Sequence, residues 1–178
     1  IERELRDAVL ALAAKHRFAR SLVNSGRLSR PCMLHGFPGF AKDAGDVSGP
    51  MRPGTPCVDA PLRTSAGRDC WLLSVIGGSP TILAFVDGTS QARQVLGDSA
   101  ALPIPGLRVY VVARQPLVEE ALPVLVDHAG LAHSRYGGKP GTIYFIRPDQ
   151  HVLGRWGTFE GARISAAWRE CLAGAGNG

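Results

Sequence analysis

The chain has 178 residues, of which 45% are hydrophobic, and its mean hydropathy is +0.03. This length fits one domain of ordinary size, and no apolar run approaches the ~20 residues of a membrane helix. The net charge of +5 comes mainly from dispersed arginines, and only the first thirty residues are locally basic, with almost no aromatic side chains among them. We therefore expect neither a nucleic acid nor a membrane as partner.

The chain is predicted to begin with an amphipathic helix from Glu2 to about Phe18. Its apolar residues recur at intervals of three and four and form one stripe, made of Leu5, Ala8, Val9, Leu12 and Ala13. Because this stripe is too apolar to face water, we expect it to pack on the body of its own chain or on the same helix of a second copy, in a homodimer. Ile1 enters the helix directly, without a signal peptide, so we expect a cut inside a longer protein.

Residues 20–53 are rich in glycine, proline and serine and are predicted to form an extended connector. A connector of this length either wraps over a surface or is partly disordered. We therefore assign residues 1–52 to the helix and connector and residues 53–178 to the folded body.

The first half of the body is predicted to contain a hairpin and two central strands. Val58 to Leu62 and Trp71 to Leu73 flank a glycine-containing turn and form the hairpin. Thr81 to Val86 and Leu107 to Ala113 are apolar on both faces, which indicates strands covered by helices on both sides. A helix is expected between them, over Thr89 to Leu96.

The second half is predicted to end in a hairpin and a closing helix. Residues 117–126 and 127–136 are expected to be helical or turn-like. Thr142 to Ile146 and His151 to Trp156 flank the turn residues Pro148 and Asp149, and a helix follows over residues 159–173. A cross-strand ion pair is expected among Arg147, Asp149 and Arg155, and Trp156 and Trp168 are expected to anchor the hairpin to the closing helix.

Three segments carry a resemblance to a known family: RPGTPCVDAPL (52–62), TILAF (81–85) and RYGGKPGTIYFIRPDQHVLGRW (135–156). Together they resemble the C-terminal thioredoxin-like domain of FAD-dependent aromatic hydroxylases, of the phenol hydroxylase and 3-(3-hydroxyphenyl)propionate hydroxylase type. The resemblance implies an α/β, thioredoxin-like fold with a central mixed sheet flanked by helices. It also implies a cytoplasmic flavoprotein monooxygenase, an oxidoreductase using FAD, NAD(P)H and O₂, as the parent. Residues 1–52 would then be the tail of the preceding flavin and substrate domains, on which this domain would pack.

A thioredoxin or peroxidase needs a low-pKa cysteine at the start of the helix after the central strand. Residues 85–94 read FVDGTSQARQ and contain no cysteine. Cys57 and Cys70 lie elsewhere and are interpreted as packing residues, and the four cysteines are too far apart for a disulfide framework or a zinc site. Redox inactivity is therefore predicted, and the alternatives that stay open are a stand-alone thioredoxin- or peroxiredoxin-like thiol protein and a basic binding module.

We predict no catalytic, cofactor-binding or metal-binding residue in this chain. No glycine-rich dinucleotide fingerprint is present, so FAD would belong to the parent chain. His128 and His133 are five positions apart, which does not place them on one helix face as metal ligands. Pro140 resembles the cis-proline before the penultimate strand of thioredoxin-like domains, but Gly141 separates it from Thr142, so both isomers stay open.

Overall fold

The computed structural model describes residues 2–16, 32–119 and 122–175, in two compact units, Ile1–Cys32 and Met33–Gly178. In the first unit the predicted N-terminal helix is confirmed as α1, Glu2–Lys15. Leu10 and Leu12 are exposed on it and Ala13 is buried, whereas the side chain of Leu5 lies outside the described residues. The packing of this stripe on the body or on a second copy stays a prediction.

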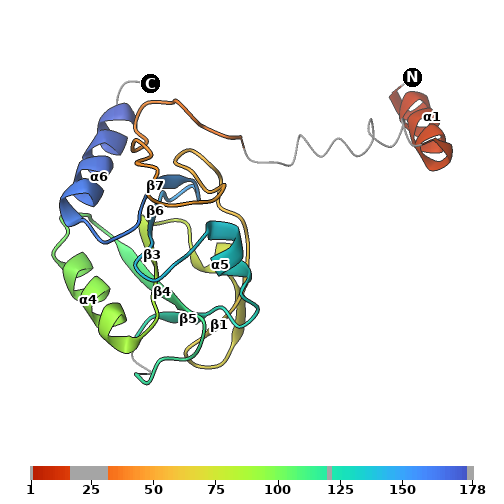
Figure 1. The fold of residues 1–178 in the computed structure, drawn as a ribbon. Helices are drawn as coiled ribbons and strands as arrows, with labels where there is room; N and C mark the ends of the chain where they lie inside the picture. The colour runs from red at the N-terminus through yellow and green to blue at the C-terminus, as the bar shows by residue number, and fades with distance from the viewer. Residues whose placement is uncertain (1, 17–31, 120–121, 176–178) are drawn as a thin grey trace. The chain divides into compact units, whose positions relative to one another are not determined.

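The second unit is built on one mixed sheet of seven strands in the order β2-β1-β5-β4-β3-β6-β7 (Figure 1). β3 and β4 pair in parallel, as do β4 and β5, whereas the other neighbours pair antiparallel. The strands are β1 (Pro61–Thr64), β2 (Asp69–Trp71), β3 (Thr81–Phe85), β4 (Arg108–Ala113), β5 (Val124–Val126), β6 (Ile143–Ile146) and β7 (Val152–Trp156). The expected α/β, thioredoxin-like mixed sheet is thereby confirmed.

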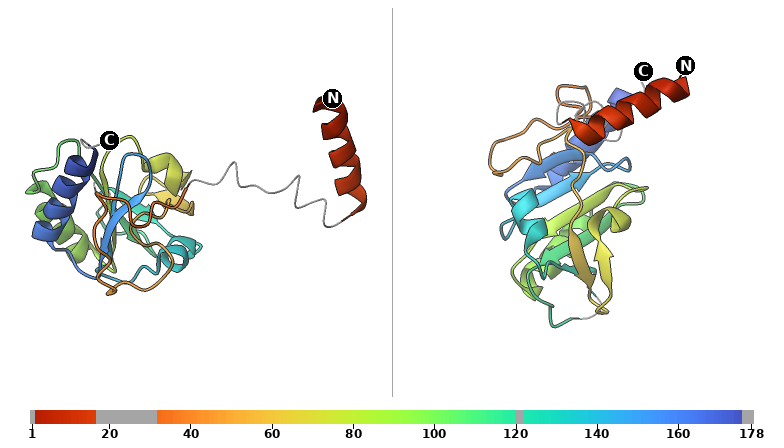
Figure 2. Two further views of the ribbon diagram at one scale, coloured as in Figure 1. Left: turned by 90° about the horizontal axis from the view of Figure 1, so that it is seen from above. Right: turned by 90° about the vertical axis from the view of Figure 1, so that its right-hand side faces the viewer.

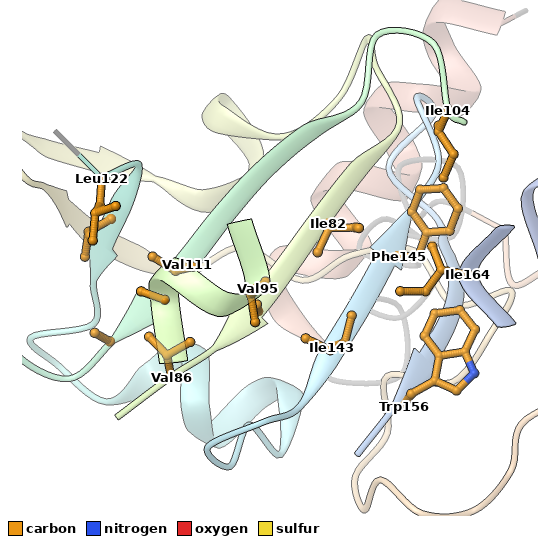
Figure 3. Packing of buried hydrophobic residues seen from close by; sticks show 14 of the residues in the cluster. Ile82, Val86, Val95, Ile104, Val111, Leu122, Ile143, Phe145, Trp156 and Ile164 are labelled. Atoms are coloured by element: carbon orange, nitrogen blue, oxygen red, sulfur yellow. The ribbon is translucent and has the colours of Figure 1, made fainter. Parts of the chain in front are cut away.

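Helices cover both faces of this sheet. α4 (Thr89–Ala100) and α6 (Gly161–Ala175) lie on one face, and α3 (Leu72–Val75) and α5 (Leu131–Tyr136) lie on the other (Figure 1). All five residues of β3 are buried, and successive side chains of a strand point to opposite faces of the sheet. Both faces must therefore be covered. Ile82 belongs to the core cluster that contains Val95 of α4 and Ile164 of α6 (Figure 3), and Leu83 belongs to the cluster that contains Tyr136 of α5.

The predicted central strands and the last hairpin are confirmed, with the bounds given above. The first hairpin is confirmed in part, because β1 and β2 pair, but Leu72 and Leu73, which were predicted as strand, belong to α3. The helix predicted from Thr89 extends to Ala100 as α4, and the closing helix is α6. The expectation for residues 117–126 was wrong in part, because Val124–Val126 form strand β5. All three residues are buried, and Val124 pairs with Val111 in the interior of the sheet. Three consecutive apolar residues are too few to distinguish a strand from a helix by periodicity.

Residues 33–53, which sequence analysis assigns to the connector, pack along β7 (Figure 1, Figure 2). The backbone N–H of Ala41 donates to Leu153 O at 2.9 Å, and Val47 and Met51 are buried in the core. The described part of the connector therefore wraps over a surface, and residues 17–31 lie outside the described residues. The proposed domain boundary at residue 53 concerns a longer protein and stays a prediction.

The expected ion pairing of the last hairpin needs a correction. Arg147 pairs with Asp149 at 3.0 Å, but Arg155 pairs with Asp43 of the connector at 2.7 Å. Arg155 is only 3% exposed, and its partners Asp43 and Gly49 belong to the connector and not to the hairpin turn. Trp156 is buried beside Ile164 of α6 (Figure 3), and Trp168 of α6 packs on Phe145 of β6, so the predicted anchoring of the hairpin to the closing helix is confirmed.

Within the described residues, no helix has both the length and the apolar character needed to cross a membrane.

Candidate functional site

The sheet topology brings four loops to one edge. The parallel strands β3, β4 and β5 end there at Phe85, Ala113 and Val126, and the antiparallel strand β6 begins there at Ile143. In open α/β sheets this carboxyl edge is where ligands usually bind. The segments that follow the three parallel strands and the segment that precedes β6 are therefore the places to look for a site.

A cavity of about 490 Å³ lies at this edge. Its walls come from all four segments: residues 86–87 after β3, residues 113–117 after β4, His133 of α5, and residues 138–140 before β6. The lining includes the apolar residues Val86, Ala113, Pro116, Leu117 and Pro140 and the polar or charged residues Asp87, Arg114, His133 and Lys139. This volume lies in the range of small-molecule sites.

A buried aspartate orients the histidine of this cavity. Asp127, the residue after β5, is 1% exposed, and its Oδ2 atom lies 2.7 Å from Nδ1 of His133. The same oxygen accepts the backbone N–H of His133 at 2.8 Å. Burial alone would raise the pKa of Asp127, but these hydrogen bonds from His133 outweigh it and hold the pKa below its usual value. Asp127 is therefore ionised at neutral pH and fixes the ring, with Nδ1 as the donor.

This geometry leaves Nε2 of His133 as the ring nitrogen for the cavity. His133 is 7% exposed, and the ring of Phe85 packs against its edge at 5.0 Å between centroids. No hydrogen bond from Nε2 to another described residue accompanies the pair with Asp127. The histidine forms part of the buried floor, whereas Arg114, Lys139 and Asp87 are exposed at the rim.

The two rim cations form no ion pair with any carboxylate in the described part of the chain. Within the described residues six other arginines do form such pairs: Arg52, Arg63, Arg93, Arg147, Arg155 and Arg163. Arg114 instead lies over the turn at Gly130, where an added Cβ would come within 2.9 Å of its Nη1 atom. The cavity therefore combines two cations and one histidine with a single carboxylate, that of Asp87.

Cys57, Cys70 and Cys171 are not among the residues that line this cavity. Where a redox thioredoxin would place its cysteine, β3 enters α4 through Val86, Asp87 and Gly88. Burial raises the pKa of the Cys57 thiol to about 12, although a hydrogen bond with Tyr136 acts in the opposite direction. Burial also raises the pKa of Cys70 and of Cys171. A thiolate is thus disfavoured at all three positions at neutral pH.

Pro140, for which sequence analysis left both isomers open, lines the cavity and follows a trans peptide bond. No group of three or more histidine, cysteine or acidic residues with metal-site geometry occurs in the described ranges. The β3–α4 turn has one glycine and places Asp87 where a dinucleotide pyrophosphate would approach a glycine-rich turn, so these residues do not fit FAD.

Sequence reasoning missed the group formed by Asp127, His133, Arg114 and Lys139. It considered His133 only as a metal ligand paired with His128, which lines two other cavities. The available signal was an aspartate directly after an apolar strand, followed by Gly130 and a short helix with histidine as its third residue. Because residues 117–126 were not expected to form a strand, this pattern was not placed at the sheet edge.

No protein-family model matches this chain, and no protein of curated function does either. Solved structures do resemble it. The flavin-dependent monooxygenase PieE, in complex with FAD and substrate, aligns with a TM-score of 0.51 and 19% identity, over 74% of this chain and 21% of that one. Aklavinone-11 hydroxylase, with FAD and aklavinone, aligns with a TM-score of 0.51 and 20% identity, over 76% of this chain and 26% of that one.

A thiol protein resembles the chain as well. The thiol peroxidase from Chromobacterium violaceum aligns with a TM-score of 0.56 and 15% identity, over 70% of this chain and 90% of that one. At these identities the likeness shows the fold alone. The chain spans about a fifth to a quarter of the two flavin enzymes and nearly the whole of the peroxidase. We conclude that the described body has a thioredoxin-like fold.

Proposed function

We propose that this chain is a redox-inactive, thioredoxin-like accessory domain of a cytoplasmic FAD-dependent aromatic hydroxylase. The observation that carries the proposal is the turn between β3 and α4, where Asp87 and Gly88 stand at the place of a catalytic cysteine. A carboxylate there can neither attack a disulfide nor reduce a peroxide. FAD and NAD(P)H would be bound by the other domains of the parent chain.

The resemblance of residues 135–156 to the hydroxylase family supports the proposal. These residues form the β6–β7 hairpin with its turn at Pro148 and Asp149, which joins α5 to the closing helix. The likeness to two flavin enzymes over a fifth to a quarter of their lengths also fits a domain within a larger chain. The domain's role would be to pack against the flavin and substrate domains or to form dimer contacts through the stripe on α1.

A thiol peroxidase or thioredoxin is the second candidate, and the fold comparisons support it equally. It would have to use a cysteine outside the usual position. Cys57 is 8% exposed and Cys70 lies on the edge strand β2, and neither lines the cavity at the end of β3. The chemistry of the site therefore favours the accessory domain.

A basic binding module is less well supported. In the described residues arginine pairs with a carboxylate at six places, in the connector, the strands, α4, α6 and their loops. In each of these pairs a nearby carboxylate offsets the positive charge of the arginine.

Sequencing the coding frame upstream of Ile1 tests the proposal. We expect a G-x-G-x-x-G motif after a predicted strand in the same frame, some hundreds of residues earlier. The protein expressed from the whole frame should then purify with bound flavin and absorb visible light, whereas residues 1–178 alone should be colourless. An initiator methionine immediately before Ile1 would contradict the proposal.

A further inference from the structure

We propose that the cavity at the carboxyl edge of the sheet binds a small organic carboxylate with an apolar body. The inference concerns a ligand of this chain itself and goes beyond the accessory role. The cavity's cations would hold the carboxylate, and its apolar residues would contact the rest of the molecule. The proposal stands on three features of the described residues, namely the two cations without an ion-pair partner, the oriented histidine and the apolar wall.

Two cations from different segments line the same cavity of about 490 Å³: Arg114 follows β4 and Lys139 precedes β6. Neither has a carboxylate partner in the described part of the chain. Asp87 is the one acidic side chain that lines the cavity, and Asp127 is buried and hydrogen-bonded to His133, so neither carboxylate forms an ion pair with Arg114 or Lys139. An anion is the ligand that two cations without such a partner favour, and arginine binds carboxylates through two parallel hydrogen bonds.

The histidine adds a polar group of fixed orientation. Asp127 holds Nδ1 of His133 at 2.7 Å, so the ring cannot turn its other nitrogen away from the cavity without breaking a buried hydrogen bond. The charged groups around the ring come from every segment at this edge: Asp87, Arg114, Asp127 and Lys139.

The apolar wall argues against a bare inorganic anion as the preferred ligand. Val86, Pro116, Leu117 and Pro140 line the cavity together with the cations. A free phosphate would leave this surface in contact with water. A carboxylate attached to a ring or short alkyl chain would cover it and remove apolar surface from water, which favours binding.

Isothermal titration calorimetry of residues 1–178 with benzoate and phenylacetate tests the inference, with benzyl alcohol as the uncharged control and inorganic phosphate as the anion without an apolar body. We expect one saturable site for the carboxylates and at least tenfold weaker binding of benzyl alcohol and phosphate. Arg114→Gln should weaken carboxylate binding by about tenfold or more, because it removes a charge-assisted pair. Arg169→Gln makes the same charge change on the exposed surface of α6 and should leave the affinity within twofold.

Nuclear magnetic resonance supplies a second readout that does not depend on a variant. Saturating benzoate should shift the ring resonances of His133 and leave those of His128 unchanged. No saturable benzoate binding, equal affinity for benzyl alcohol, phosphate binding as tight as benzoate, or binding unaffected by both Arg114→Gln and Lys139→Gln would each overturn the inference. All of these results are independent of whether a flavin domain precedes the chain, so failure here is distinguishable from failure of the accessory role.

Discussion

Arg155 of β7 forms a bidentate ion pair with Asp43 of the connector, which lies 112 positions earlier in the sequence. Its Nε atom donates to Oδ1 at 3.0 Å and its Nη2 atom to Oδ2 at 2.7 Å, while Nη1 donates to the backbone oxygen of Gly49 at 3.0 Å. Arg155 is 3% exposed. The connector is thus joined to the sheet by a buried cation that binds both the Asp43 carboxylate and the Gly49 carbonyl oxygen.

Asp43→Asn should lower the free energy of unfolding by about 2–3 kcal/mol, because it leaves a buried guanidinium without its counter-charge. Urea unfolding at pH 7 measures this change. Asp69→Asn is the matched control, because it breaks the exposed pair with Arg63 and should change stability by no more than about 0.5 kcal/mol. An equal decrease in the free energy of unfolding in the two variants would show that the buried pair stabilises the fold no more than the exposed pair does.

Acid should destabilise the fold through Asp43 and Asp127. Hydrogen bonding to Arg155 lowers the pKa of Asp43, and the hydrogen bonds from His133 lower the pKa of Asp127 against the opposing effect of burial. Because both folded pKa values lie below the ordinary aspartate value of 3.8, the unfolded chain binds more protons in this range. The stabilisation is therefore fully present above the unfolded pKa and is lost as the pH falls through the folded pKa.

Urea midpoints recorded from about pH 6 down to about pH 3 should fall with decreasing pH. The fall should be shallower in Asp43→Asn and in Asp127→Asn than in the native chain. Identical pH profiles for all three proteins would contradict this account of the two carboxylates.

Gly138 should tolerate no side chain. A Cβ atom there would overlap the ring of Phe85, which is fully buried under α5, so the ring has no free space to move into. Gly138→Ala is therefore expected to cost about 1–3 kcal/mol. Gly97→Ala, in the middle of α4 with no atom near the added Cβ, should instead stabilise by about 0.5–1 kcal/mol. Thermal or urea unfolding of the two variants measures whether each change lowers or raises the free energy of unfolding. A Gly138→Ala variant as stable as the native chain would show that the segment before β6 moves to accommodate the added Cβ.

The cysteines should differ in reactivity. Cys32 is exposed, whereas Cys57 is buried and its pKa is raised to about 12. With a disulfide reagent such as DTNB at pH 8, Cys32 should react at least tenfold faster than Cys57, because the thiolate is the reacting species. Comparison of the native chain with Cys32→Ser and Cys57→Ser assigns the phases. A fast phase that disappears in Cys57→Ser would place an activated thiol where the structure has a packing residue.

The sequence was sufficient for the parts of the fold with strong local patterns. β3 and β4 are apolar on both faces, and the last hairpin has turn chemistry at Pro148 and Asp149, so each could be recognised alone. β5 could not, because three apolar residues between Pro123 and Asp127 have no distinguishing period. The partner of Arg155 could not be predicted either, because Asp43 is remote in sequence and only the packing of the connector brings the two together.

The cavity was unpredictable for the same reason. Each of its charged residues has an ordinary local context: Arg114 and Lys139 read as surface cations, and His133 reads as an isolated histidine. Their common position follows from the parallel order of β3, β4 and β5 and from the antiparallel entry of β6. Once β5 is known to be a strand, Asp127 falls at the carboxyl edge of the sheet and the group can be assembled.

We expect the chain to lack thiol-dependent redox activity. Turnover of hydrogen peroxide and of insulin disulfides by purified residues 1–178 tests this expectation most directly. The assay would compare the native chain with Cys57→Ser, Cys70→Ser and a variant lacking all four cysteines, in the presence of dithiothreitol as reductant. We expect the native rate to equal that of the cysteine-free variant, because residues 85–94 offer no thiol at the start of α4. A rate well above that background, abolished by Cys57→Ser or Cys70→Ser, would contradict the claim and identify the chain as a thiol enzyme.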